Sequence, residues 1–129
     1  MAGKFLLDTN IVIAALGSEQ SVLQQIDDAD QYFVSATVLG EMLYGAFSSA
    51  KSNKNRERLD AFIVRSRFLK CDKQTAFFYG EIKMSLRHKG KPIPENDIWI
   101  AASAQQHSLV LATRDAHFDN VDGISIANW

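Results

Sequence analysis

Four acidic residues in this sequence have positions from which their carboxylates could act together. They are Asp8, Glu41, Asp97 and Asp115. Asp8 draws attention first, because it stands between two apolar runs, at residues 5–7 and 11–16. Carboxylates that are held close together repel one another unless protons or a cation neutralise them. Their hard oxygens suit Mg²⁺ or Mn²⁺, so a converging set would form a divalent-metal site.

Zinc is not the ion to expect at such a site. His88, His107 and His117 show none of the spacings that are typical of zinc ligands, and Cys71 is the only cysteine. We therefore interpret the three histidines as surface or core residues. The lone cysteine excludes a disulfide framework and indicates a reducing, cytoplasmic location.

Each of the four acids, taken alone, has a simpler structural interpretation. Asp8 and Asp97 could each cap a helix, and Asp97 could instead be a first-turn acid favoured by the helix dipole. Glu41 lies opposite the apolar stripe of its predicted helix, which is typical of an exposed surface residue. Asp115 could be an ordinary turn residue. What argues for a shared role is that the fold should bring all four together.

The elements that would position the acids alternate between short strands and helices. The predicted strands are residues 4–7, 32–35, 68–71, 109–112 and 124–127. The predicted helices are residues 8–16, 21–27, 37–49, 59–65, 75–89 and 96–106. Gly17 is the expected C-cap of the first helix, and Thr37 is the expected N-cap of the third. The polar, basic residues 51–58 are predicted to form an exposed connection, and residues 90–95, with two prolines, a loop.

This alternation predicts an α/β fold, a three-layer α/β/α sandwich around a central, mostly parallel sheet. In a parallel sheet, the carboxyl ends of all strands and the amino ends of the crossover helices lie at one edge, where ligands bind. Asp8 ends the first strand, Asp115 follows the fourth, Asp97 opens a helix, and Glu41 lies about one turn into another. We therefore expect all four carboxylates at that edge.

The composition fits this fold class. The chain has 129 residues, of which 47% are hydrophobic and 22% charged, as in a soluble globular protein with one domain over residues 1–129. No apolar run approaches the roughly 20 residues of a membrane span, and Asp8 interrupts the N-terminal run that a signal peptide would need. The net charge of −1 excludes a global basic field for nucleic acid, but not a local basic surface beside an acidic centre.

The chain contains, in this order, the segments LLDTNIVI, TVLGEMLYGA, GKPIPENDIWIAASA, LVLATRDAHF and ISIANW. In sequence and in order, these five segments resemble the PIN-domain nucleases, most closely the VapC-type toxins of toxin–antitoxin pairs. The resemblance covers nearly the whole chain and implies a metal-dependent endoribonuclease of PIN-like fold. It assigns the catalytic and metal-binding roles to Asp8, Glu41, Asp97 and Asp115, with one or two Mg²⁺ or Mn²⁺ ions.

Three further residues are expected to support these acids. Thr9 matches the small hydroxyl residue that follows the family's first aspartate. Thr113 matches the hydroxyl residue found two positions before the fourth acid. Asn96 is expected to help cap the helix that carries Asp97, while Glu95 is interpreted as a loop acid.

The reaction expected from the resemblance is hydrolysis of RNA phosphodiester bonds by in-line attack of water. Such attack does not use the 2′-hydroxyl, so the products would carry a 5′-phosphate and a 3′-hydroxyl, and a 2′,3′-cyclic phosphate would contradict it. The resemblance also implies a homodimer and a small antitoxin that blocks the site with a basic side chain. The surface around residues 42–44 is the expected docking region.

Two basic clusters are candidates for gripping RNA. The first comprises Lys51, Lys54, Arg56 and Arg58, and the second Lys83, Arg87, His88, Lys89 and Lys91. Phosphate contacts from such side chains would make binding salt-dependent. We interpret the first cluster as a solvated surface. The second leads into the loop before Asp97, and the RNA contacts expected there are Lys83, Arg87, Lys89 and Lys91.

Other interpretations of the acids remain open at this level. A phosphotransfer domain also has an aspartate at a strand end, but here no paired acids precede Asp8 and no well-placed lysine follows a later strand. A haloacid-dehalogenase-like phosphatase would have a second aspartate where Asn10 stands. A noncatalytic RNA- or protein-binding module, and an RNA-maturation nuclease of the same family, are the remaining alternatives.

Overall fold

A five-stranded parallel sheet lies at the centre of the protein in the computed structural model, which describes residues 3–129. Its strands are β1 (Lys4–Leu7), β2 (Gln31–Ser35), β3 (Arg67–Leu69), β4 (Val110–Ala112) and β5 (Ser125–Ala127). Their order is β3-β2-β1-β4-β5, and every neighbouring pair is parallel. The predicted α/β fold is therefore confirmed, and the sheet is parallel throughout.

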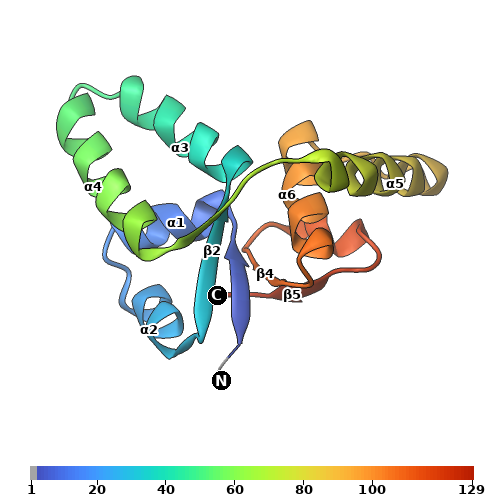
Figure 1. The fold of residues 1–129 in the computed structure, drawn as a ribbon, viewed down its shortest axis with the longest axis horizontal. Coiled ribbons are helices and arrows are strands. Elements are labelled where there is room, and N and C mark those ends of the chain that lie inside the picture. The colour runs from blue at the N-terminus through green and yellow to red at the C-terminus, as the bar shows by residue number, and fades with distance from the viewer. Residues whose placement is uncertain (1–2) are drawn as a thin grey trace.

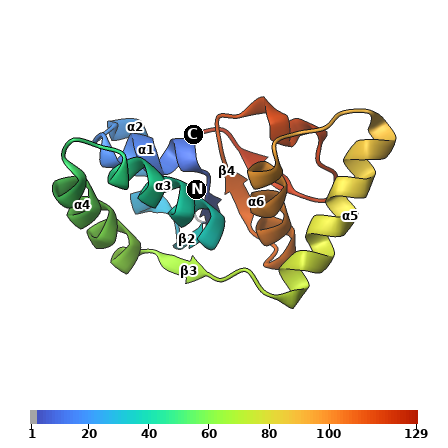
Figure 2. The ribbon, with the colours of Figure 1, turned by 90° about the horizontal axis from the view of Figure 1, so that it is seen from above.

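Helices cover the sheet from both sides. They are α1 (Thr9–Leu16), α2 (Gln20–Asp28), α3 (Ala36–Phe47), α4 (Ser52–Arg65), α5 (Lys73–Lys89) and α6 (Glu95–Gln106), with a 3-10 helix η1 (Ala116–Asn120). Figures 1 and 2 show α1 to α4 gathered on one side of β1 and β2, and α5 and α6 on the other. Among residues 3–129, no helix combines the length and apolar character that crossing a membrane requires.

The core lies where the central strands meet these helices. Leu6, Leu7 and Leu111 on β1 and β4 are fully buried, as expected for a parallel sheet covered on both faces. α6 contributes five consecutive buried residues, at positions 100–104, because it packs against both α5 and β4. The prediction that residues 96–106 form a buried helix is therefore confirmed for most of its length.

The strand order reverses between β1 and β4. The chain moves outward from β1 to β2 and β3, and then returns to place β4 on the other side of β1. The connections that follow β1 and β4 therefore diverge, and ligands bind at such a switch point in open α/β sheets. At the carboxyl ends of the two strands, the N–H of Asp8, which follows β1, donates to the carbonyl of Ala112, the last residue of β4, at 3.0 Å. This contact holds the two divergent connections together at their starting points.

The prediction of an exposed connection over residues 51–58 is wrong, because α4 begins at Ser52. The first two turns of α4 are polar all round and have no side-chain N-cap, so no apolar periodicity marks them. Tertiary contacts hold them instead: Asn55 donates to the Ser49 hydroxyl at 2.8 Å, and Arg58 donates to the Leu16 carbonyl. Leu59 then anchors the helix in the core.

Two of the predicted helix caps are also wrong. Ser35, at the end of β2, caps α3 by accepting from the Val38 N–H, so Thr37 lies inside the helix. α6 begins at Glu95 after Pro94, so Asn96 lies in its first turn and does not cap it. In both cases the chain enters the helix earlier than the side-chain preferences indicated. Gly17, by contrast, is confirmed as the C-cap of α1.

Candidate metal centre

Asp8 lies at the centre of the carboxylate cluster, where β1 gives way to α1. Its residue is only 4% exposed, and its two oxygens accept from the Thr113 hydroxyl at 2.7 Å and the Thr9 N–H at 2.8 Å. Burial raises the pKa of Asp8; the two hydrogen bonds oppose the shift, and the charges of Asp97 and Glu41 add to it. Asp8 is thus both the N-cap of α1 and a carboxylate whose negative charge is costly where it stands.

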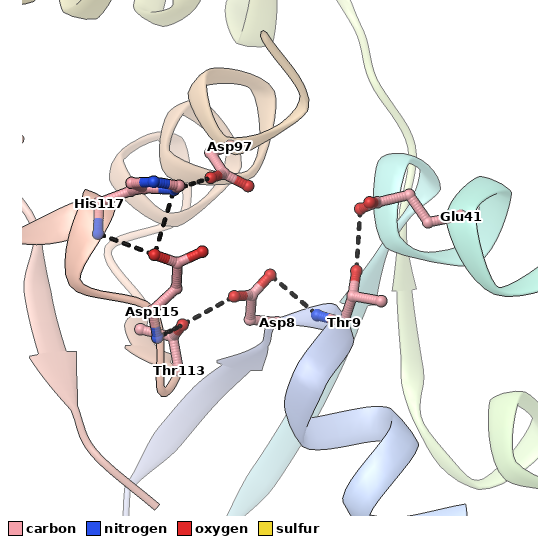
Figure 3. Close-up of polar contacts among 7 residues, drawn as sticks. All are labelled: Asp8, Thr9, Glu41, Asp97, Thr113, Asp115 and His117. Atoms are coloured by element: carbon pink, nitrogen blue, oxygen red, sulfur yellow. Dashed lines mark hydrogen bonds and ion pairs between the residues drawn. The ribbon is translucent and has the colours of Figure 1, made fainter. Parts of the chain in front are cut away.

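Asp97 and Asp115 meet a histidine on one side of Asp8. The His117 Nδ1 lies 3.0 Å from an Asp97 carboxylate oxygen and 3.1 Å from an Asp115 carboxylate oxygen (Figure 3). One ligand atom from each of the three residues lies within 4.8 Å of the other two, as the ligands of one metal ion do. Burial raises the pKa of Asp97, the His117 hydrogen bond opposes this shift, and the Asp115 charge adds to it.

Glu41 approaches from α3, on the other side of Asp8 (Figure 3). It is partly buried, and one of its oxygens accepts from the Thr9 hydroxyl at 2.8 Å. The helical pattern alone had favoured an exposed surface glutamate, and the structure does not support that interpretation. Because α3 packs against α1, this face of α3 points toward α1 and not toward solvent.

The loop after β4 is held by a chain of hydrogen bonds. The Thr113 hydroxyl donates to Asp8 and accepts from the Asp115 N–H at 3.0 Å. The Asp115 carboxylate in turn accepts from the His117 N–H at 2.9 Å, which caps η1. Arg114 holds the other face of the loop, since its Nε donates to the Trp129 carbonyl at 2.6 Å and its guanidinium pairs with Glu19. The loop can therefore present Asp115 and His117 in one arrangement.

The remaining predicted residues lie around this cluster. Asn96 is exposed and lines a surface hollow together with Thr9, Glu41 and Tyr44. The second basic cluster lies on the C-terminal half of α5 and the loop that follows. Two of its members have acidic partners: Lys83 pairs with Glu95 at 2.5 Å, and Lys89 pairs with Asp122 at 2.7 Å. Arg87 and Lys91 are exposed.

His117 is the member of the site that the sequence analysis missed. The histidines were judged by zinc-ligand spacing, and none of them has it. The available signal was different: His117 comes two residues after Asp115, at the same end of the same strand. A residue at that distance can fold back onto an aspartate in a tight turn, as an Asx turn does here. His117 is exposed, as the surface interpretation expected, but its contacts with Asp97 and Asp115 were not predicted.

The His117 ring should titrate above its ordinary range in the metal-free protein. Its hydrogen bond to Asp97 raises the pKa, partial burial opposes this, and the Asp115 and Asp97 charges raise it further. We expect the NMR titration of the ring in the full chain to have a midpoint above about 6.5. Asp97→Asn should move the midpoint down, whereas Asp28→Asn, an exposed change on α2, should leave it in place. A midpoint that stays the same in Asp97→Asn would contradict the pairing of His117 with Asp97.

Comparison with known proteins finds matches over nearly the whole chain. A profile of the family described as PIN domain matches residues 5–124. The chain is 33% identical to "Ribonuclease VapC2" of Haemophilus influenzae, with 98% of each chain covered. It is 31% identical to "tRNA(fMet)-specific endonuclease VapC" of Salmonella typhimurium, again with 98% of each covered. In the crystal structure of DNA bound VapBC from Salmonella typhimurium, a chain 31% identical superimposes with a TM-score of 0.93, covering 98% of each chain.

Proposed function

Because the chain belongs to the PIN-domain family, we propose that it is a divalent-metal-dependent endoribonuclease and the toxin of a toxin–antitoxin pair. The observation that carries the proposal is the convergence of Asp8, Glu41, Asp97 and Asp115 at the switch point of the sheet. The four come from widely separated parts of the chain. A structural role for any one of them as a helix cap or turn residue does not require the others to be there.

The donor set fits Mg²⁺ or Mn²⁺. Carboxylate oxygens predominate in it, which is the ligand type that both ions prefer. Burial and neighbouring charges raise the pKa of both Asp8 and Asp97, so a bound cation would offset a repulsion that the protein alone leaves in place. Because carboxylates lie on both sides of Asp8, we propose that the site holds one ion or two. The residues that would hold them are Asp8, Asp97, Asp115 and Glu41.

In the reaction, such an ion would lower the pKa of a bound water and would stabilise the negative charge that builds on the phosphoryl oxygens. The chain's own residues supply orientation. Thr113 and the Thr9 N–H fix both oxygens of Asp8, so this carboxylate cannot rotate. The Thr9 hydroxyl fixes one oxygen of Glu41, and the other can accept a hydrogen bond from the attacking water. Asp97 is the alternative group that would accept a proton from the attacking water.

RNA would reach the site across the end of α5. Arg87 and Lys91 are exposed there and can contact phosphates, while Lys83 and Lys89 would have to share their charge with Glu95 and Asp122. The similarity to a tRNA(fMet)-specific endonuclease makes initiator tRNA the first substrate to test.

An antitoxin would dock beside the acids. A groove of about 350 Å³ between α1, α3 and α4 is lined by Ile13, Met42 and Leu59, and Glu41 lies at its edge. Exposed Tyr44 and the groove provide apolar area for a partner helix, and a basic side chain on that helix could enter the carboxylate cluster. The match to a VapBC complex supports this assignment. We also propose that the chain forms a homodimer.

Cleaved RNA should carry a 5′-phosphate and a 3′-hydroxyl. In-line attack by water breaks the bond to the 3′-oxygen without involving the 2′-hydroxyl, so a 2′-deoxy substitution at the cut nucleotide should leave cleavage intact. The ends of fragments from a small-RNA pool that includes initiator tRNA, cut with Mg²⁺ or Mn²⁺, can be identified by their competence for ligation and kinase labelling. EDTA should prevent the cuts. Fragments ending in a 2′,3′-cyclic phosphate would contradict the mechanism.

A further inference from the structure

We propose that His117 is itself a ligand of the metal, so that the site combines one imidazole nitrogen with carboxylates and prefers Mn²⁺ to Mg²⁺. This inference rests on the proposed function, because it concerns the same metal centre. It adds a nitrogen ligand to a site for which the sequence indicated only oxygen ligands.

The His117 ring nitrogen is spaced from the two carboxylates as adjacent ligands of one ion are. Two ligands at right angles, each about 2.1 Å from an octahedral ion, lie about 3 Å apart. The His117 Nδ1 is 3.0 Å from the nearer Asp97 oxygen and 3.1 Å from the nearer Asp115 oxygen. The ring nitrogen therefore already stands in the relation of an adjacent ligand to both carboxylates. In this position it faces the two groups that the proposal assigns to the ion.

The backbone of His117 also holds this ring in place. The His117 N–H donates to the same Asp115 carboxylate that its ring faces, which ties the residue to the ligand loop. The next residue, Phe118, is fully buried and anchors η1 in the core. Half of the ring remains exposed, so solvent and ions can reach it. A histidine that served only to fill space would not need its Nδ1 directed between two carboxylates.

A nitrogen ligand also affects which ion the site would prefer. Mg²⁺ prefers a site made only of oxygen ligands and keeps several waters, whereas an imidazole nitrogen suits first-row transition metals. Mn²⁺ is the ion of that series whose preference for carboxylates matches Asp8, Asp97 and Asp115 as well. The mixed set therefore favours Mn²⁺ over Mg²⁺. The competing role for His117 is that of an ion-pair partner, which would leave the carboxylates when metal binds.

The experiment uses Mn²⁺ as the probe on the purified full chain. Pulsed EPR detects ¹⁴N coupling to bound Mn²⁺ when an imidazole nitrogen is a ligand, and ¹⁵N-histidine labelling of the unaltered protein identifies its source. Calorimetric titrations with Mn²⁺ and with Mg²⁺ give the two affinities. The variant is His117→Leu, which has no donor atom, and the matched control is His107→Leu at the exposed end of α6. Circular dichroism checks that both variants fold.

The unaltered protein and His107→Leu are expected to show histidine ¹⁴N coupling, and His117→Leu is expected to lose it. His117→Leu should also bind Mn²⁺ about 10-fold or more weakly while Mg²⁺ affinity changes far less. Bound Mn²⁺ without histidine coupling in the unaltered protein would overturn this inference and leave the proposed nuclease standing. Coupling that survives His117→Leu would overturn it too. A chain that binds neither ion would overturn both the inference and the metal-dependent function.

Discussion

Asp97→Asn is expected to lower metal-dependent RNA cleavage by at least about 100-fold while the protein stays folded. Losing even an outer-shell partner of a metal typically costs about 10- to 100-fold in affinity or activity, and Asp97 is proposed as a direct ligand. Its side chain is 15% exposed and faces His117, so water cannot readily take its place. Asparagine keeps the size of the side chain and removes its charge. The change therefore tests the charge that the metal needs rather than the packing of α6.

The control for this variant removes one negative charge elsewhere. Asp28→Asn alters an exposed acid at the end of α2, whose carboxylate accepts a hydrogen bond from the Gln24 amide at 3.0 Å. Initial rates should be compared with Mg²⁺, with Mn²⁺ and with EDTA on the same RNA. Asp28→Asn is expected to cleave like the unaltered chain. If Asp97→Asn cleaved normally, or if RNA bound equally well with and without metal and was never cut, a noncatalytic binding module would be the better interpretation.

The convergence of the carboxylates was predictable because it follows from topology alone. Once strands and helices alternate, parallel pairing places the residue after β1 beside the residues after β4 and at the start of α6. Asp8, Asp97 and Asp115 occupy those three places, and the exact ends of the elements do not affect the conclusion. The separate prediction that residues 1–129 form one domain stays a prediction.

What the sequence did not predict depends on contacts between elements. Topology placed Glu41 at this edge, but helical periodicity alone favoured an exposed residue, because it describes one helix and cannot show the contact between α3 and the Thr9 hydroxyl on α1. α4 was predicted too short because tertiary contacts, not an apolar stripe, hold its first turns. His117 was missed because its role comes from a tight turn onto Asp115. Local patterns thus predicted the five strands, although β3 ends at Leu69 and not at residue 71, while side-chain direction required the packed structure.

Asp8→Asn is expected to raise the free energy of unfolding of the metal-free protein by about 0.5–2 kcal/mol. This is the usual gain when a residue that is needed for function but destabilises the fold is replaced by one that does not. Burial raises the pKa of Asp8, so its charge is less favourable in the folded state than in the unfolded chain. Asparagine can still accept from the Thr9 N–H and pair with the Thr113 hydroxyl. The variant therefore loses the charge and keeps the contacts.

The sign of the pH dependence follows from that raised pKa. Below the unfolded pKa of about 4, Asp8 is protonated in both states and the variant gains nothing. As the pH rises from the unfolded pKa toward the folded pKa, the unfolded chain ionises Asp8 while the folded protein keeps it protonated, so the advantage of Asp8→Asn should grow. Above the folded pKa it should level off. Thermal unfolding at several pH values between 4 and 8, with EDTA present, measures this difference. Asp28→Asn should show no comparable gain.

Adding metal should reverse the order of stability. An ion that binds only the folded protein stabilises it by RT ln(1 + [L]/Kd), which is about 2.7 kcal/mol at 100 times Kd. The unaltered chain should gain this stability from Mn²⁺ or Mg²⁺, and Asp8→Asn should gain much less, because its central carboxylate is gone. A variant that is less stable than the unaltered chain without metal would mean that Asp8 serves mainly as the cap of α1. If Asp8→Asn is more stable than the unaltered chain without metal and less stable with metal, then Asp8 serves to bind an ion. If it is less stable under both conditions, then Asp8 serves the fold.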